Sequence, residues 1–387
     1  MLGMSTITYK CPNCSGRLEF DSTAQTMKCP FCDSAIDVAS LAYLDEALGA
    51  DSSQTAAGFQ PPAGYPVDYP PPQPGEAEWL LPNQTWTDEE QEGMIVYTCS
   101  TCAGAIVSDL TLSSTSCPYC GNPIVITDRF SGYLKPDMVI PFQLTKSDAK
   151  AALLKHYQDK PLLPKFFKDD NRIDEIKGVY VPYWLFSSTL DAEALYNCTT
   201  VRNYSDNKYN YTETRYYSVN RSGTVEFMHV PVDGSIRLAD DLTESIEPFD
   251  YTQLIQFQSA YLAGYSANIY DVTAETAISR AQERMKTTAE EVVRTSVTGY
   301  STVKAEQMDI TYRNPRCLYA LLPVWLLSST FEGKVYTFAM NGQTGRLVGD
   351  VPVDKSLRVQ SFLKTLGIAF AAILIIAIIF GWTGGYV

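Results

Sequence analysis

Eight of the ten cysteines in this chain form four Cys-x-x-Cys pairs, a spacing that suits metal binding. Thiolate sulfur is a soft ligand, and four thiolates around Zn²⁺ form the tetrahedral shell of a structural zinc site. One Cys-x-x-Cys turn supplies two sulfurs, and a short hairpin can bring a second turn alongside it. The pattern predicts two zinc ions per chain, held by Cys11, Cys14, Cys29 and Cys32 and by Cys99, Cys102, Cys117 and Cys120.

Both sets have the same internal spacing, with fourteen residues between the two pairs. Two alternatives compete with zinc: a redox Cys-x-x-Cys motif, or unrelated buried thiols. A thioredoxin-type motif needs one pair beside a βαβ pattern, and no such pattern surrounds these pairs. Because Met1–Lys10 lacks the features of a signal peptide, we expect a reducing compartment in which thiols bind metal. The other two cysteines, Cys198 and Cys317, are expected in the core.

Each cysteine set needs a hairpin to position it, and this predicts two zinc ribbons, at residues 1–38 and 93–129. Both segments carry the same pattern of Tyr, Gly, Asp, Thr and Pro around their cysteines. The intervening linker, residues 39–92, contains a stretch at 50–78 that is rich in Pro, Gly, Ala, Ser and Gln. Such a composition buries too little apolar surface to order itself, so we expect a semi-extended linker that lets the first ribbon move near its anchor.

A second, weaker repeat lies in the rest of the chain. It consists of two pairs of similar segments: Val181–Thr189 with Leu322–Thr330, and Val230–Asp233 with Val351–Asp354. The first copy is longer between its two landmarks, and we place the insertion in the Tyr-rich stretch Tyr196–Tyr217. The repeat predicts two related α+β units.

Helix and hairpin signals fill in these units. Thr145–Asp148 has the pattern of a capping box, which predicts a helix start. A second helix is predicted by apolar residues at three- and four-residue spacing: Ile278, Ala281, Met285, Ala289 and Val292. Val335–Met340 followed by Asn341-Gly342 predicts a hairpin, because Asn and Gly tolerate positive φ. The expected fold is therefore multidomain α+β, with one unit at 130–250 and the other at 251–360.

The C-terminal segment is apolar enough to cross a membrane. Thr365–Val387 contains no charged residue, and a helix of this length spans about 34 Å, enough for the hydrocarbon core of a bilayer. We predict a transmembrane helix at 364–386, with a buried helix of a soluble domain as the alternative. Basic residues precede the segment and none follows it: Lys355, Arg358 and Lys364. The positive-inside rule then predicts a single-pass cell-membrane protein whose N-terminal bulk is cytoplasmic.

The balance of charge bears on the kind of partner. The chain has 30 basic and 44 acidic residues, a formal net charge of −14, whereas binding to nucleic acid usually needs a basic face. Tyr9–Asp37 of the first ribbon has three basic and four acidic residues, and Tyr97–Ile126 of the second has only Asp109. Phe31 and Tyr119 occupy equivalent places between two ligands, where they either dock into a partner or pack the ribbon. We therefore expect protein rather than nucleic acid as the partner.

No pattern in the chain indicates catalysis. It lacks the GxxxxGK[ST], GxSxG and HExxH motifs, and its two histidines, His156 and His229, have no acid or nucleophile motif beside them. His156 is expected at the surface of a helix. A run of acidic residues is expected to form a solvated face, with an ion site as the alternative: Asp240, Asp241, Glu244 and Glu247. We expect a protein that is not an enzyme, with no catalytic or organic-cofactor site.

Taken together, these segments resemble a bacterial family of double-zinc-ribbon proteins with a C-terminal membrane helix. The resemblance extends over nearly the full length and includes both ribbons, FSGYLKPDMVIPF, DEIKGVYVPYWLF, YLAGYSANIYD and the segment around TFAMNGQTGRLVGD. Family members are often labelled zinc-ribbon or helicase-like, but this chain has no helicase motif. Some are encoded beside phage-shock protein A and stomatin/flotillin-like proteins, which implies partners among cytosolic and membrane-associated proteins.

The leading hypothesis is a membrane-anchored adaptor, contacting the lipid bilayer, whose ribbons recruit cytosolic proteins in membrane stress or membrane organisation. The alternative is a membrane-tethered regulator that binds nucleic acid, and the missing basic surface counts against it.

Overall fold

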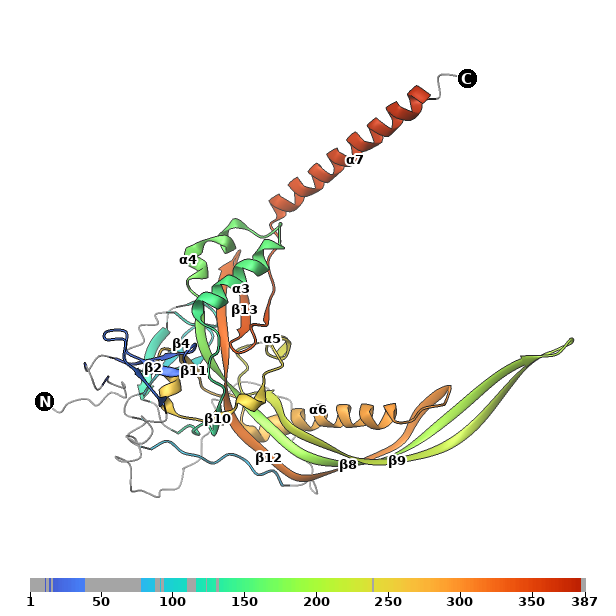
Figure 1. The fold of residues 1–387 in the computed structure, drawn as a ribbon, viewed down its shortest axis with the longest axis horizontal. Helices are drawn as coiled ribbons and strands as arrows, with labels where there is room; N and C mark the ends of the chain where they lie inside the picture. The colour runs from blue at the N-terminus through green and yellow to red at the C-terminus, as the bar shows by residue number, and fades with distance from the viewer. Residues whose placement is uncertain are drawn as a thin grey trace.

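The structure, a computed structural model, describes residues 11, 14, 17–38, 78–87, 91, 94–109, 116–122, 124–129, 132–238 and 240–383. The described chain is mostly β-sheet with helices packed around it, so the prediction of mixed helices and strands is confirmed at that level. Most of the predicted linker, residues 39–92, lies outside the described residues. A long curved hairpin and a C-terminal helix both project from the body (Figure 1).

One large sheet organises the body. Its strands are β4 (Met94–Cys99), β5 (Ala105–Asp109), β6 (Ile124–Arg129), β7 (Met138–Val139), β8 (Lys177–Ser205), β9 (Asn210–Asp233), β10 (Ile255–Gln256), β11 (Ser266–Asn268), β12 (Thr302–Phe331), β13 (Lys334–Asn341) and β14 (Leu347–Gly349). The order is β10-β7-β12-β8-β11-β5-β4-β6, with β9 paired to β8, β13 to β12 and β14 to β13. The long strands β8 and β12 pair antiparallel at the centre, so residues far apart in sequence share one core.

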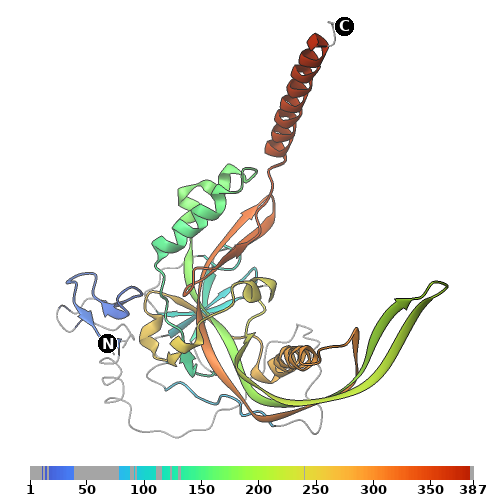
Figure 2. The ribbon, with the colours of Figure 1, turned by 45° about the vertical axis from the view of Figure 1, so that its right-hand side comes forward.

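Burial along β8 follows its sequence. The run Val179–Ser188 is buried throughout, as in a strand covered on both faces. From Leu190 to Cys198 every second residue is buried, which is the period of a strand with one covered face. The helix α6 (Ala274–Thr295) lies along that face, and its Val293 packs into the same apolar cluster as Cys198. Figure 1 and Figure 2 show α6 on the concave side of the curved strands.

The apolar face predicted for α6 is confirmed with one exception. Ile278, Ala281, Met285 and Ala289 are all buried. Val292, however, is 48% exposed, and Val293 takes the buried position instead. The step after Ala289 is four residues rather than three because the face of a 3.6-residue helix alternates between the two spacings.

The other predicted helix start is also confirmed. In α3 (Lys146–Gln158), Thr145 Oγ1 accepts a hydrogen bond from the Asp148 amide at 3.3 Å, and the Thr145 amide donates to the Asp148 carboxylate at 2.9 Å. These reciprocal bonds are a capping box. Within the described residues, the remaining short helices are α4 (Asp170–Ile173), α5 (Asp240–Ser245), and the 3-10 helices Lys165–Lys168, Tyr251–Gln253 and Ser259–Leu262.

Each long helix packs on strands of the other half of the chain. α3 precedes β8, yet its Tyr157 ring lies 5.5 Å from the ring of Phe338 in β13. α6 precedes β12, yet it packs mainly against β9 and β8. The segments predicted as separate units, 130–250 and 251–360, therefore share one sheet and exchange their helices.

Two tryptophans make equivalent bonds across this exchange. Trp184 Nε1 donates to the carbonyl of Val272, one residue before the N-cap of α6, at 2.9 Å. Trp325 Nε1 donates to the carbonyl of Leu144, one residue before the N-cap of α3, at 3.2 Å. Each tryptophan of a long strand thus fixes the start of the helix from the other half.

Two glycines continue the correspondence. The amide of Gly234 donates to Pro182 O at 2.9 Å, and the amide of Gly342 donates to Pro323 O at 2.8 Å. A Cβ atom on either glycine would lie within 3.2 Å of its proline. The counterpart of Asp233-Gly234 is therefore Asn341-Gly342.

This correspondence overturns the predicted match between Val230–Asp233 and Val351–Asp354. The first segment ends β9 within the sheet, whereas the second lies beyond β14 and leads into the C-terminal helix. Their shared residues are not a shared structural position. The longer connection in the first copy is the β8–β9 hairpin. This hairpin contains the stretch Tyr196–Tyr217 predicted as an insertion.

The hairpin predicted after Met340 forms, but its turn is not at Asn341-Gly342. Met340 pairs with Leu347, and the residue with positive φ is Gly345, at 78°. Asn341 acts through its buried side chain instead, accepting the amide of Gln343 at 2.9 Å. The two-residue turn that the Asn-Gly pair favours does not form, because both residues make other hydrogen bonds. The Gly342 amide donates to Pro323 O, and the Asn341 side chain accepts the amide of Gln343.

The first ribbon has its own small sheet of β1 (Glu19–Asp21), β2 (Thr26–Lys28) and β3 (Ala35–Ile36). It is seated on the body: the Phe20 ring meets the Tyr261 ring edge-on at 5.2 Å, and Gln25 Nε2 donates to Phe142 O at 2.8 Å. This contact differs from the expectation of a freely moving ribbon. Apolar Phe20, which shares a buried cluster with Cys11, Cys29 and Tyr261, provides the contact that the sequence pattern did not reveal.

The second ribbon is part of the large sheet. Its strands β4, β5 and β6 pair with one another, and β5 pairs antiparallel with β11. Ile106 and Val107 are buried at this junction. The predicted segment 93–129 thus does not form a sheet of its own.

The C-terminal helix α7 (Lys355–Thr383) begins earlier than the predicted 364. Within the described residues, Lys355–Ile375 is long and apolar enough to cross a membrane, and none of it is buried against the rest of the chain. Its outward apolar residues include Phe362, Leu366, Ile368 and Phe370. This exposure disagrees with the alternative of a buried core helix.

Candidate metal centres

The first four cysteines converge as the sequence predicts. The sulfurs of Cys11 and Cys32 lie 3.5 Å apart, those of Cys14 and Cys29 lie 3.4 Å apart, and all four fall within 4.8 Å of one another. Cys11 and Cys29 are buried, whereas Cys14 and Cys32 are exposed. The site can therefore be reached from solvent on one side.

The second four converge in the same way at a more enclosed place. The sulfurs of Cys99 and Cys120 are 3.5 Å apart, those of Cys102 and Cys117 are 3.6 Å apart, and all four again lie within 4.8 Å. Only Cys102 is partly exposed. The two centres share a ligand geometry but differ in access.

These distances suit a tetrahedral thiolate site. Zn–S bonds of about 2.3 Å place the sulfurs about 3.8 Å apart in a tetrahedron, and disulfide sulfurs would be about 2 Å apart. All eight cysteines are free thiols in the structure. Each group could therefore bind one metal ion.

Three of the cysteine turns have one backbone pattern. Cys29, Cys99 and Cys117 each accept, through the carbonyl, the amide of the residue four positions later, and each donates to the carbonyl five positions later. The fourth position has positive φ in every case: 55° at Asp33, 54° at Ala103 and 73° at Gly121. In this turn the backbone amides that follow the cysteines approach the sulfur atoms, such as the amide of Ser34 at Cys32 and that of Gly104 at Cys102.

Hydrogen bonds favour the thiolate form at particular ligands. The Ser34 hydroxyl, 3.1 Å from Cys32 Sγ, lowers the pKa of that thiol to about 6. In the second centre, the hydrogen bond between Cys102 and Cys117 lowers the pKa of Cys102 and raises the pKa of Cys117. Metal binding needs deprotonated sulfur, so lowered pKa values favour it at neutral pH.

Two cations stand close to the second centre. Arg237 donates to the carbonyl of Cys102 and forms an ion pair with Asp271 at 2.9 Å. Lys177 Nζ donates to the carbonyl and to the hydroxyl of Ser116, the latter at 2.7 Å. A divalent metal with four thiolates has a formal charge of −2, so these cations stabilise it. The sequence pattern missed both residues because they lie on distant segments with no motif of their own.

The two turn aromatics differ. Phe31 is 76% exposed, whereas Tyr119 is only 5% exposed. The Tyr119 ring packs close to Gly104, where an added Cβ would lie 3.4 Å away. The expectation of an exposed aromatic is therefore met by Phe31 alone. Tyr119 follows the packing alternative because it lies in a buried apolar cluster with residues of β8 and β12.

A cavity of about 680 Å³ lies between the first ribbon and the body. Asp21 and Lys28 line it on the ribbon side, and Lys146, Lys177 and Trp325 line it on the body side. The mixture of both charges favours neither an anionic nor a cationic ligand.

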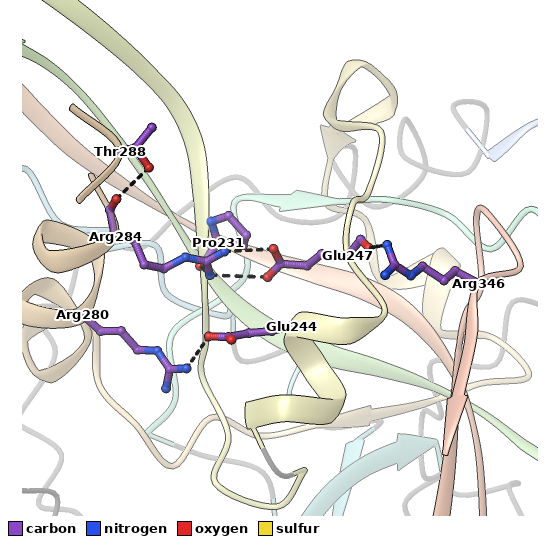
Figure 3. A network of polar contacts seen from close by, with 7 residues as sticks. All are labelled: Pro231, Glu244, Glu247, Arg280, Arg284, Thr288 and Arg346. Carbon is purple, nitrogen blue, oxygen red and sulfur yellow. Dashed lines mark hydrogen bonds and ion pairs between the residues drawn. The ribbon is translucent and has the colours of Figure 1, made fainter. Parts of the chain in front are cut away.

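The acidic run predicted as a solvated face is partly engaged in ion pairs. Glu244 pairs with Arg280, and Glu247 pairs with Arg284 at 3.0 Å (Figure 3). Arg346 also donates to the carbonyl of Glu247. The ion pairs join α6 to α5 and to the segment after it, and the Arg346 bond joins that segment to the β13–β14 turn. Glu244 and Glu247 therefore have a structural role.

The remaining candidates show no catalytic arrangement among the described residues. Cys198 and Cys317 are buried in apolar clusters, as predicted. His156 is half-buried on α3, rather than lying freely on its surface, with its ring 6.3 Å from Phe338. His229 lies in β9 with its ring beside Tyr251.

Comparison with known proteins relates the chain to an uncharacterized bacterial protein. No family model and no solved structure matches it. It is 34% identical over 262 residues to the uncharacterized protein YdjG of Bacillus subtilis, an alignment covering 68% of this chain and 76% of that protein. The chain has two four-cysteine centres and an apolar C-terminal helix on one body. By the identity and coverage of this alignment, it belongs to the family of this uncharacterized Bacillus protein.

Proposed function

We propose that this protein is a membrane-anchored adaptor whose two zinc ribbons, each binding one Zn²⁺, recruit cytosolic proteins to the membrane. Zinc supplies a rigid cross-link that holds each pair of turns together. α7 supplies the anchor, and the bulk of the chain lies in the cytoplasm. The partners implied by the family resemblance are phage-shock protein A-like and stomatin/flotillin-like proteins.

The observation that carries the proposal is the exposure of Phe31. Phe31 lies between Cys29 and Cys32 in the sequence, so a metal-held turn would fix its backbone, while 76% of the residue faces solvent. A rigid, exposed aromatic has little conformational entropy to lose when a partner covers it, and such residues commonly dominate interface energy. Phe31 is therefore the expected centre of the docking surface.

The charge of the ribbons supports a protein partner over nucleic acid. Near the first centre, Lys28 pairs with Asp33 at 3.5 Å, which reduces its capacity to neutralise phosphate. Each four-thiolate zinc centre adds a formal charge of −2. Affinity for nucleic acid depends largely on replacing counterions at phosphates, and these surfaces offer few cations for that.

A capture experiment tests the adaptor proposal. Tagged full-length protein is purified from detergent-solubilised membranes as wild type, as Phe31→Ser and as Leu80→Ser. Leu80 is a matched control because it is 73% exposed but distant in sequence from either centre. We expect phage-shock protein A-like or stomatin/flotillin-like proteins with the wild type and Leu80→Ser, and their loss with Phe31→Ser at unchanged zinc content.

Equal capture by all three proteins would refute the role of Phe31. Fluorescence anisotropy with labelled DNA at physiological and at higher salt tests the competing function. Salt-sensitive binding tighter than about 1 µM would favour a nucleic-acid-binding regulator, since non-specific binders reach only about 1–100 µM at physiological salt.

Protease treatment tests the orientation. Lys355, Arg358 and Lys364 lie in the first turns of α7, before its uncharged part. Protease added outside intact spheroplasts should leave the ribbons and the sheet uncut. Cleavage in these regions would place them on the outer side and contradict a cytoplasmic adaptor.

A further inference from the structure

The outer part of the β8–β9 hairpin, residues 199–217, forms an arm. Residues 300–302 contact its base at Thr199, Val201 and Tyr217, and no other described strand pairs with the arm beyond Val201. β12 pairs with β8 only as far as Thr199, so the arm beyond Val201 has two strands and two unpaired edges. In Figure 1 and Figure 2 it reaches far from the body and curves toward the side from which α7 projects. The arm adds little to the buried core, because most of its residues are exposed. The chemistry of these exposed side chains therefore indicates what kind of surface the arm contacts.

Tyrosines are concentrated on this arm. Tyr204 and Tyr211 stack at 5.1 Å, and Tyr209 meets Tyr211 edge-on at 6.3 Å. Tyr216 is 81% exposed. A tyrosine combines an apolar ring with a polar hydroxyl, which is why it gathers at the boundary between water and hydrocarbon.

These aromatics lie on both faces of the ribbon. Tyr204 and Tyr211 pair directly and continue the face of Cys198, the face that α6 covers nearer the body. Tyr216 pairs with Thr199 and lies on the opposite face. A groove in a partner protein would cover one face, whereas the headgroup layer of a bilayer surrounds whatever enters it.

The charge of the arm also suits an anionic lipid surface. The chain as a whole is strongly acidic, but residues 199–217 contain three basic and two acidic residues. Glu213 forms an ion pair with Arg215 at 2.7 Å, and Asp206 accepts the amides of Lys208 and Tyr209, each at 2.8 Å. The arm therefore has a net charge of +1. A basic residue near an anionic leaflet gains about 1 kcal/mol from the surface potential.

We propose that the arm tip lies in the headgroup region of the same bilayer that α7 crosses, so that the protein contacts the membrane at two places. The inference rests on the proposed anchor. The unpaired edges limit the depth, because backbone groups without hydrogen bonds are excluded from hydrocarbon. The tip is therefore interfacial and does not span the membrane.

Photo-cross-linking in nanodiscs tests this contact. Full-length protein is reconstituted with phosphatidylcholine and phosphatidylglycerol, carrying benzoyl-phenylalanine in place of Tyr209, Tyr216 or Met228. Met228 is a matched control because it is 59% exposed on the same strand but nearer the body. We expect lipid adducts at the first two positions and few at Met228, with a roughly fivefold lower yield when phosphatidylglycerol is omitted.

Equal lipid yields at all three positions, no lipid adduct at the tip, or adducts only to a second copy of the chain would each overturn the proposal. Co-elution of the protein with the nanodiscs is scored first. A chain that fails to enter them would overturn the proposed anchor and the arm contact together, whereas a chain that enters without tip adducts would overturn the arm contact alone.

Discussion

At the scale of single residues, the cysteine turns depend on the position four residues after a cysteine. Asp33, Ala103 and Gly121 all have positive φ there. Glycine adopts this conformation freely, whereas a Cβ atom costs about 1–2 kcal/mol. Ala103 is exposed, so its methyl group has little packing to offset that strain.

Replacing Ala103 by glycine should therefore stabilise the second ribbon. The relieved strain exceeds the extra entropy that glycine loses on folding, for a net gain of roughly 0.5 kcal/mol. Denaturant unfolding of zinc-loaded protein measures the change. Gly121→Ala is the reciprocal control and should be less stable than wild type, and a destabilised Ala103→Gly protein would contradict the argument.

Loss of a ligand should affect the two centres differently. Purified protein should contain about two zinc ions, and Cys29→Ser and Cys117→Ser should each lose about one. Because β5 pairs with β11, we expect Cys117→Ser to destabilise the large sheet, whereas Cys29→Ser should release only the first ribbon. Zinc analysis and limited proteolysis measure both effects.

A protein purified without chelator or oxidant that contains no zinc would refute the metal assignment. Equal protease sensitivity of the sheet in the two variants would show that the second centre does not support it.

His156 should make stability sensitive to acid. Burial, and then the charge of Lys160, lower the pKa of His156 below that of the unfolded chain. Protonation therefore favours unfolding: the contribution to stability is complete above about pH 6.5 and is lost as the pH falls toward the folded pKa. Denaturant unfolding of wild type should lose more stability between pH 7 and pH 6 than unfolding of His156→Gln. Comparing the two proteins cancels the acid sensitivity of the thiolate centres, and parallel losses would contradict the role of His156.

At the scale of elements, the exchanged helices link distant substitutions to local order. Trp325 lies in β12, but its indole bonds the carbonyl just before α3. Trp325→Phe should cost about 1 kcal/mol for the lost hydrogen bond and should speed amide exchange in the first turn of α3. Trp184→Phe should do the same at the first turn of α6. Faster exchange confined to the neighbours of Trp325 within β12 would contradict the coupling.

The comparison of sequence with structure separates local from long-range information. The capping box at Thr145 and most of the α6 face could be predicted because a few neighbouring residues determine them. The cysteine spacing likewise predicted the two groups of four cysteines that converge. The burial of Tyr119, the cations at Lys177 and Arg237, and the exchange of helices depend on contacts between distant segments, which no short pattern encodes.

At the scale of the whole molecule, the arm should be dispensable for folding. Cys198 and Tyr217 pair directly, so an Asn-Gly turn can join them in place of residues 199–216. The shortened protein should keep its zinc content and lose less than about 1 kcal/mol of unfolding free energy, because the removed residues are mostly exposed. Denaturant unfolding and zinc analysis measure this, and collapse of the sheet would contradict it.

The exchange of helices between halves also constrains how the protein is made. As the chain leaves the ribosome, β8 and α3 emerge long before β12 and β13, on which they depend for pairing and packing. Neither half can complete its core until Asn341 has been synthesised, and contacts of such wide sequence separation form slowly. α7 begins at Lys355, only shortly afterwards. The apolar helix α7 and the strands that close the sheet therefore leave the ribosome at nearly the same moment of biosynthesis.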